Sequence, residues 1–363
     1  MSKERIYVCH TFYHLYISCL KELALGDDAG KATVLLSKMS NDFGDIKERV
    51  EASGLFEEVF SFDEKRETYF DELDKYRVNK GNILLNMISR IKYTKKLGEL
   101  EKPFIPVNLK EYRDIYVFCD HDPIGYYLNR YKIKYHAVED GLDCIVYLNS
   151  AYSDNVPYFK FKKFMSDKLG LIFINDGYGK YCIDMEVNNI AAIVPYCKKF
   201  KEVPRTTLVE RLTEKDKEIL VKIFVRDYEG LMTKINSLDT DKECVLILTE
   251  PLCTLDVRQR IFEDLTAKYS AEGNVVIKPH PRDNFDYENH FTDNICIDGS
   301  VPMEVLNFIP GVHFRKVVSV FTPLDAISFA KEKEMLGPDF MDKYEDPSKH
   351  IQSRERFEKE HKK

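Results

Sequence analysis

Short runs of apolar residues, rich in β-branched and aromatic types, recur along the chain and alternate with longer stretches of helical periodicity. The short runs predict strands, and the longer stretches, such as 15–25, 82–97 and 255–269, predict helices. The predicted strands are residues 6–9, 33–36, 58–62, 115–119, 135–138, 245–248, 275–277, 295–297 and 317–320. Strands that alternate with helices form βαβ units with parallel sheets, and continuously apolar strands indicate helices on both faces. The pattern therefore predicts an α/β protein.

The strand–helix alternation is interrupted between about residues 149 and 243. Thr213 opens a helical segment there, with Asp216 three positions later as in a capping box. We predict an N-terminal α/β domain over 1–180, a helical connection over 181–243, and a C-terminal α/β domain over 244–363. The densely charged residues after Ala330 predict a surface helix with a frayed end.

Composition and charge narrow the class of protein. The 363 residues suit about two domains, and the net charge of −7 argues against a nucleic-acid partner. The sequence lacks an uncharged apolar run of the ~20 residues that cross a bilayer, and Arg5, His10 and His14 occupy positions that are apolar in a signal peptide. None of the 9 cysteines forms a C-x-x-C pair, so we expect free thiols and a cytoplasmic location.

Polar groups follow several of the predicted strands, at the edge where parallel sheets bind ligands. These groups are Glu139, Asp140, Thr249, Glu250, Asp256, Lys278, His280, Arg282 and Thr322. Because they follow strands of both domains, we expect the two parallel sheets to face a central cleft that holds the ligand.

The segment Lys278-Pro-His-Pro-Arg282 carries a lysine, an imidazole and a guanidinium on a backbone stiffened by two prolines. These groups could bind a phosphate and protonate it as it leaves, since histidine titrates near neutrality. The alternative is a rigid turn beside a surface lysine.

Two further strand ends carry weaker signals. In Glu139-Asp140-Gly141 a carboxylate could accept a proton from a hydroxyl, although a solvated turn explains the residues as well. Thr322, followed by Pro323 and Asp325, predicts a helix start whose free N–H groups suit a phosphate, and plain helix capping is the alternative.

The acidic pair with glycine and the Lys-x-His-Pro motif together resemble the signature of bacterial sialyltransferases of the lipooligosaccharide and capsule type, glycosyltransferase family 52, to which the polysialyltransferases are related. The segments 8–13, 248–252 and 301–304 are similar to further parts of that family, in order along the chain. The resemblance implies a GT-B fold of two Rossmann-like domains and CMP-sialic acid as the donor. It implies that neither a cofactor nor a metal is required, and that the anomeric centre is inverted.

The resemblance also implies roles for single residues. His280 is expected as the general acid toward the CMP phosphate, and Lys278 and Pro281 as residues that line the nucleotide. They lie in the C-terminal domain, which by the resemblance binds the nucleotide sugar, while the N-terminal domain is the acceptor side. Arg282 is a candidate for binding the phosphate by its charge. Glu304 is expected to bind the ribose, and Thr322 the phosphate. Phe321 stands where the family usually has a second hydroxyl residue, which shifts part of the phosphate binding to Ser319 and to backbone amides. The general base is left open between the Glu139–Asp140 pair and Asp256.

Several alternatives stay open. The donor could be UDP-, GDP- or another nucleotide sugar, or the scaffold could bind sugars or nucleotides without catalysis. His10 and His14 have helical metal-ligand spacing but lack the intervening Glu of a zincin, so we favour a strand-end loop and a packed helix. Asp120-His121-Asp122 resembles a metal-binding D-x-D, and there we favour a loop or an acceptor-side role. We predict no metal at either place. The basic and aromatic residues 158–165 permit peripheral contact with the inner membrane face and a lipid-linked acceptor, although core packing is the favoured interpretation. A homodimer is also left open.

Overall fold

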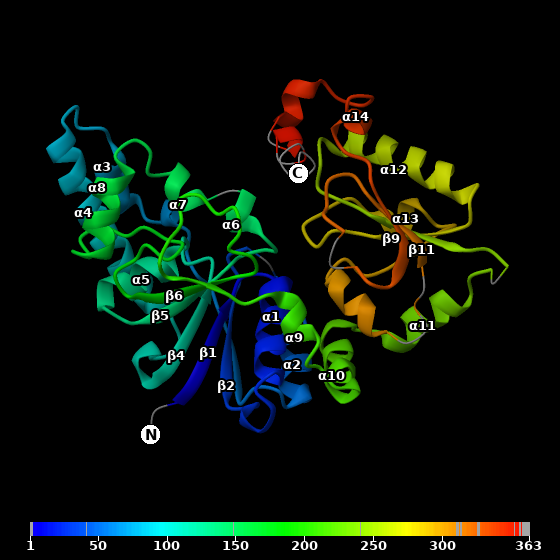
Figure 1. Cartoon of the computed structure of the whole chain (residues 1–363), viewed down its shortest axis with the longest axis horizontal. Helices are drawn as coiled ribbons and strands as arrows, with labels where there is room; N and C mark the ends of the chain where they lie inside the picture. The colour runs from blue at the N-terminus through cyan, green and yellow to red at the C-terminus, as the bar shows by residue number, and fades with distance from the viewer. Residues whose placement is uncertain are drawn as a thin grey trace. The chain divides into compact units, whose positions relative to one another are not determined.

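The computed structural model describes residues 3–40, 42–147, 149–239, 241–309, 312, 314–324, 327–351, 353–355 and 357. The chain divides into two compact units, Met1–Leu212 and Thr213–Lys363. Each unit contains one parallel sheet with helices packed on it (Figure 1). The predicted α/β class is therefore confirmed. In the described part of the chain, no helix combines the length and the apolar character that crossing a bilayer requires.

The first unit is built on a seven-stranded sheet with the order β3-β2-β1-β4-β5-β6-β7. All neighbouring strands in it are parallel. The strands are β1 (Lys3–Cys9), β2 (Ala32–Ser37), β3 (Glu58–Phe62), β4 (Tyr112–Phe118), β5 (Tyr135–Val138), β6 (Cys182–Val187) and β7 (Phe200–Glu202). The helices are α1 (Phe12–Leu23), α2 (Ile46–Ser53), α3 (Asp74–Arg77), α4 (Ile83–Glu101), α5 (Pro123–Tyr131), α6 (Cys144–Tyr147), α7 (Ser150–Ser153), α8 (Phe159–Asp167) and α9 (Arg205–Val209). The chain runs outward from β1 to β3 and returns to β4 on the other side of β1, so the strand order reverses between β1 and β4.

Burial explains the continuous apolar character of β1. Ile6 and Val8 point to one face of the sheet and Tyr7 and Cys9 to the other, and all four are buried. Helix α1 follows closely because the hydroxyl of Thr11 accepts the backbone N–H of His14 at 3.1 Å and caps the helix. This cap places the first turn of α1 directly after the end of β1.

The second unit contains a five-stranded sheet with the order β10-β9-β8-β11-β12, and its strands are also parallel. The strands are β8 (Cys244–Leu248), β9 (Asn274–Lys278), β10 (Ile295–Cys296), β11 (Phe314–Ser319) and β12 (Ala330–Met335). The helices are α10 (Glu214–Phe224), α11 (Tyr228–Asn236), α12 (Leu255–Ser270), α13 (Tyr287–His290) and α14 (Pro338–Met341). The capping box predicted at the start of α10 is confirmed, with Thr213 and Asp216 bonded reciprocally.

Three expectations differ from the structure. The segment predicted as a helical connection, 181–243, includes β6 and β7, which extend the first sheet, while α10 and α11 belong to the second unit. Ala330–Met335 is a strand rather than a surface helix, and its exposed lysine and glutamate side chains suit the edge of a sheet. The helix start at Thr322 is also wrong, because the described residues 320–324 and 327–329 are not helical; Asp325 lies outside the described residues.

Candidate active site

The carboxyl ends of β1, β4 and β5 meet around the reversal of strand order in the first unit. His10 follows β1, Cys119 follows β4, and Glu139 and Asp140 follow β5, while His14 comes from the first turn of α1. In open parallel sheets this edge is where ligands bind. The first candidate site is therefore built from strand ends that are distant in sequence.

His14 and Asp140 form a hydrogen-bonded pair at this edge. Nε2 of His14 lies 2.6 Å from Oδ1 of Asp140, and the backbone N–H of His10 donates to Nδ1 of His14 at 3.0 Å. Because Nδ1 is an acceptor, the neutral ring carries its proton on Nε2 and donates it to Asp140. Burial lowers the pKa of His14, although Asp140 acts in the opposite direction, so the ring is neutral at pH 7.

Asp140 keeps 52% of its side chain exposed, and the thiol of Cys119 donates to the same Oδ1 at 3.0 Å. Burial of the carboxyl group acts to raise its pKa, but His14, the Cys119 thiol and the charge of His121 outweigh that effect and hold the pKa of Asp140 well below its usual range. Asp140 is therefore an ionised, oriented carboxylate within reach of solvent. Such a group can accept a proton from a hydroxyl.

Glu139, the other member of the predicted acidic pair, faces into the fold. Its Oε1 accepts the backbone N–H of Ile145 at 3.0 Å and its Oε2 accepts that of Asn188 at 2.7 Å. The side chain is fully buried, and burial raises its pKa. Glu139 thus joins β5 to the segments around it, and the carboxylate available for chemistry is that of Asp140.

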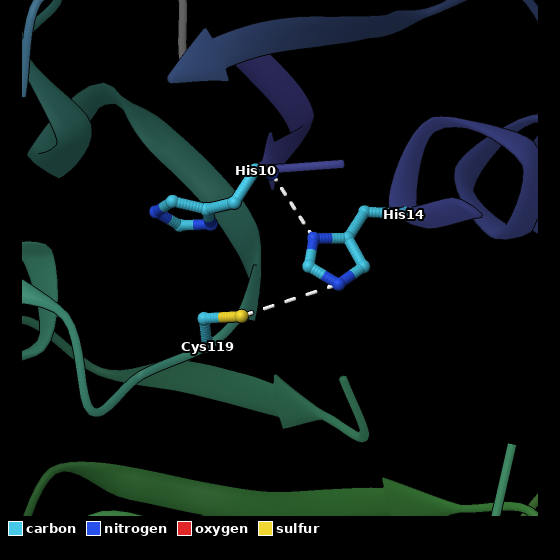
Figure 2. Close-up of side chains that lie close together, drawn as sticks. All are labelled: His10, His14 and Cys119. Atoms are coloured by element: carbon cyan, nitrogen blue, oxygen red, sulfur yellow. Dashed lines mark hydrogen bonds between the residues drawn. The ribbon is translucent and has the colours of Figure 1, made fainter. Parts of the chain in front are cut away.

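His10, His14 and Cys119 bring two nitrogen ligands and one sulfur ligand within 4.8 Å of one another (Figure 2). Zinc accepts such a donor set. Nε2 of His14 faces Asp140, and the thiol of Cys119 donates to the same carboxylate at 3.0 Å. Burial raises the pKa of the Cys119 thiol well above its ordinary value. We interpret the cluster as the support of Asp140.

Asp120 of the D-x-D sequence is also structural. Its Oδ2 accepts the hydroxyl of Tyr135 at 2.7 Å and its Oδ1 accepts the backbone N–H of Asp176 at 3.1 Å. Asp122 is the residue directly before α5, and its Oδ2 lies 3.6 Å from Nε2 of His10. The two aspartates therefore have different surroundings and do not form one exposed pair.

In the second unit, the Lys278-Pro-His-Pro-Arg282 segment follows β9. The ammonium group of Lys278 is buried and donates to the backbone oxygens of Pro279 at 2.8 Å and Gly299 at 2.9 Å. Burial lowers the pKa of Lys278 to about 7, against the attraction of Asp298 and Glu304. Lys278 therefore joins two backbone segments, and the expectation that it lines the nucleotide gains no support from this arrangement.

His280 is half-buried, and its ring orientation is fixed. Its backbone N–H donates to the hydroxyl of Thr249, and its Nδ1 accepts the backbone N–H of Arg282, both at 3.1 Å. The neutral ring consequently carries its proton on Nε2. Burial, followed by the charges of Arg282 and Lys278, lowers the pKa of His280 to about 4.

A buried ion pair holds this segment in place. Nη1 of Arg258, on α12, lies 2.5 Å from Oδ1 of Asp283, and Oδ2 of Asp283 accepts the hydroxyl of Thr249 at 3.2 Å. Thr249 in turn accepts the N–H of His280. The position of the His280 imidazole thus depends on Thr249, which follows β8, and on Arg258 of α12.

The loop after β11 surrounds a single carboxylate oxygen. Oε1 of Glu250 accepts the backbone N–H groups of Val320 at 3.0 Å, Phe321 at 2.8 Å and Thr322 at 2.9 Å. Successive amides that converge in this way form an anion-binding concavity. Burial raises the pKa of Glu250, and the amides oppose that rise. Ser319 is buried and donates to the backbone oxygen of Thr322 at 2.7 Å, so it closes the loop instead of facing a ligand.

These groups line one cavity of about 260 Å³ that includes Glu250, His280, Arg282 and Thr322. The remaining predicted residues lie elsewhere in the second unit. Asp256 is exposed in the first turn of α12, Pro281 is exposed beside His280, and Glu304 lies on the 3-10 turn Met303–Phe308. Neither Pro281 nor Glu304 lines this cavity.

Sequence reasoning missed the supporting residues of both sites. From the sequence, His14 is expected in a packed helix, Glu250 is one of several polar groups after a strand, and no motif marks Arg258. Their functions depend on partners 126, 70 and 25 positions away. The signal that could have identified Glu250 is its place directly after Thr249 at a strand end.

Two parallel α/β units with polar carboxyl edges are the architecture of GT-B glycosyltransferases, and the fold points to that class of protein. Residues 57–335 match Glycosyltransferase family 52, and the chain belongs to that family. The resemblance stated from the motifs is therefore confirmed.

Two solved structures have a similar fold. An α-2,3-sialyltransferase from Photobacterium phosphoreum superposes with a TM-score of 0.51 at 11% identity, over 92% of this chain and 90% of that one. A 2,6-sialyltransferase from Photobacterium sp. JT-ISH-224, in complex with CMP and lactose, gives a TM-score of 0.54 at 11% identity, over 99% of this chain and 77% of that one. An uncharacterised protein of Haemophilus influenzae is 33% identical over 96 residues, which are 25% of this chain and 30% of the length of that relative.

Proposed function

We propose that this chain is an inverting sialyltransferase that moves sialic acid from CMP-sialic acid to a hydroxyl of a glycan acceptor, with galactose as the favoured acceptor sugar. The observation that carries the proposal is the cavity in which the imidazole of His280, the guanidinium of Arg282 and Thr322 converge. Family membership supports the reaction class. A solved sialyltransferase of similar fold was crystallised with CMP and lactose, which is consistent with the donor and with a galactoside acceptor.

The second unit would supply the leaving-group chemistry. His280 presents Nε2–H, since Nδ1 accepts the N–H of Arg282. A phosphate in the cavity would raise the pKa of His280 by its negative charge, so the ring could protonate the departing CMP as the glycosidic bond breaks. Arg282 would neutralise part of the charge that develops on the phosphate. We expect transfer to proceed without an added metal, which would be seen as an unchanged rate in EDTA.

The first unit would supply the general base. Asp140 is ionised and half-exposed, and His14 and Cys119 fix one of its oxygens. The acceptor hydroxyl would lose its proton to this carboxylate while it attacks the anomeric carbon. Asp256, which is exposed at the start of α12, is the second candidate for the base. Ribose binding by Glu304 stays a proposal.

Incubation of the protein with CMP-sialic acid and a panel of galactosides, followed by mass spectrometry, tests the reaction. His280→Ala should reduce the rate by roughly 10²–10⁴-fold with little loss of CMP affinity. His290→Ala is the matched control, because His290 belongs to the same unit and is bonded to Glu263 outside the cavity. Parallel reactions and thermal-shift measurements with UDP- and GDP-sugars test the alternative donors. Absence of transfer from every donor, with no effect of His280→Ala on ligand binding, would favour a non-catalytic binding protein.

A further inference from the structure

Helix α8 presents an outward face made of lysines and phenylalanines. Phe161 and Phe164 are 54% and 51% exposed, and Lys160 and Lys168 flank them at helical spacing. The expectation that Phe161 and Phe164 pack in the core is wrong, because Phe159 and Met165 occupy the buried side. About half of each of these two side chains is thus left accessible to solvent by the described part of the chain.

Exposed apolar side chains are frequent in the stretch of sequence that contains this helix. Six of the eighteen large hydrophobic residues that are exposed in the described part of the chain fall within 152–169. They are Tyr152, Val156, Tyr158, Phe161, Phe164 and Leu169. Soluble proteins rarely expose such a concentration of apolar side chains unless it binds something.

The helix is firmly held, so its exposed face is a fixed feature. The hydroxyl of Ser166 donates to the backbone oxygen of Tyr178 at 3.0 Å and accepts the N–H of Ile174 at 3.1 Å. Phe159 packs edge-to-face against Tyr178 at 5.2 Å. Exposure of Phe161 and Phe164 therefore follows from the anchoring of the opposite side of α8.

Charge indicates the kind of partner. Among the described residues, Lys160 and Lys163 have no carboxylate within ion-pair distance, and Asp167 is shared between Lys168 and Lys199. A second copy bound through the same face would bring these lysines together, since a two-fold interface pairs identical surfaces. An anionic surface neutralises them and also accepts the aromatic rings between its headgroups.

We propose that the exposed face of α8, with the flanking residues Tyr158 and Leu169, docks this protein on a bilayer of anionic phospholipids. Phe161 and Phe164 insert at the headgroup level, and Lys160 and Lys168 contact lipid phosphates. In Figure 1, β1 runs away from the N-terminus, and α7 and α8 lie at the end of the first unit where β1 finishes. Asp140 follows a strand parallel to β1 and lies at that same end. The proposal does not depend on the enzymatic activity.

Sedimentation of the full chain with vesicles tests the surface. The protein should pellet with vesicles that contain phosphatidylglycerol, should stay in solution with pure phosphatidylcholine, and should be released by salt. Phe161→Ser with Phe164→Ser should weaken binding at least about tenfold, and Lys160→Glu should weaken it by roughly fivefold or more. Val194→Ser with Tyr196→Ser is the matched control, because these exposed apolar residues lie in another segment and should leave binding unchanged.

Circular dichroism of each variant shows whether it is folded. The proposal is overturned if the folded wild-type chain ignores anionic vesicles, or if the folded Phe161/Phe164 variant binds them as the wild type does. It is also overturned if the wild type is a dimer without lipid that dissociates in that variant, because the face would then belong to a second copy.

Discussion

Nε2 of His14, which is fully buried, lies 2.6 Å from Oδ1 of Asp140, whose side chain is half-exposed. The backbone N–H of His10 occupies the other nitrogen of the ring. A second proton on His14 would break that bond, so the imidazole acts as a neutral donor that fixes the carboxylate. The bond to His14 distinguishes Asp140 from its neighbour Glu139, whose two oxygens accept backbone N–H groups inside the fold.

Asp140→Asn should remove the proposed base and leave the fold intact. We expect the rate of transfer to fall by roughly 10²–10⁴-fold with little change in melting temperature, because the amide keeps the shape of the carboxyl group but cannot take the proton. Steady-state kinetics and thermal unfolding of the same preparation provide the measurement.

Glu139→Gln is the matched comparison for that variant. Glutamine keeps one acceptor for Ile145 or Asn188 but places a donor against the other amide, so stability should fall by about 1–3 kcal/mol. If Asp140→Asn remains active and Asp256→Asn does not, the base is Asp256.

His14 should make the first unit less stable as the pH falls. Its pKa is lowered in the folded state, so below the unfolded value near 6.5 the unfolded chain binds a proton that the folded chain does not. The contribution of His14 to the free energy of unfolding is therefore fully present above that pH. It decreases as the pH falls through that value, by at most about 1.4 kcal/mol for each pH unit. Calorimetry between pH 7 and pH 5 should show that lowering the pH is more unfavourable to the stability of the wild type than to that of His14→Gln; the comparison is needed because the pKa of neighbouring His10 is raised and acts in the opposite direction.

His136→Gln is the control, because His136 also pairs with an aspartate, Asp184, at 2.6 Å but is not buried as His14 is. If the stability of the wild type and that of the His14→Gln variant change equally with pH, the folded chain protonates His14 as readily as the unfolded chain does, which contradicts the prediction.

The sequence predicts strands well where burial on both faces makes them continuously apolar, as in β1 and β8. It also identifies strand ends, and so it places His280 and Asp140 at the carboxyl edges of the two sheets. It fails at Ala330–Met335, because an edge strand with one unpaired side tolerates charged residues that resemble a helix surface. It also cannot distinguish Glu139 from Asp140, because the difference lies in which backbone amides meet each carboxylate.

The loop after β11 illustrates the same limit at the second site. Thr322 is at the predicted location, yet no helix begins there in the described residues, and its amide is bonded to Glu250. A turn of consecutive amides around a carboxylate needs no characteristic residue, since the backbone supplies every donor. The sequence can therefore point to backbone amides near Thr322, but that three of them meet Glu250 is visible only in three dimensions.

The imidazole of His280 should be neutral in the free protein and should gain basicity when a nucleotide phosphate binds. Its pKa of about 4 reflects burial first and then the charges of Arg282 and Lys278. A phosphate beside Nε2 would oppose all three effects. Titration of the His280 ring protons by NMR, with and without CMP, should show the pKa moving upward in the complex.

Arg282→Gln should raise the pKa of His280 in the free protein, because it removes one of the charges that lower it. His290 provides the internal reference in the same spectra, since it lies outside the cavity. An unchanged pKa of His280 at saturating CMP would place the phosphate elsewhere.

Glu250→Ala should vacate the amide concavity of Val320, Phe321 and Thr322. Three N–H groups that now share Oε1 of Glu250 would lose their acceptor, and each unsatisfied buried group costs about 1–3 kcal/mol where water cannot reach it. The melting temperature of the variant should therefore fall. Inorganic phosphate or CMP should raise the melting temperature of Glu250→Ala more than that of the wild type, because the anion takes the place of the carboxylate.

Glu263→Ala, which removes an exposed carboxylate of α12 away from the cavity, should show neither effect. If phosphate stabilises Glu250→Ala no more than the wild type, the amides serve only to hold the loop, and the phosphate of the donor must bind to Arg282 and His280 without them.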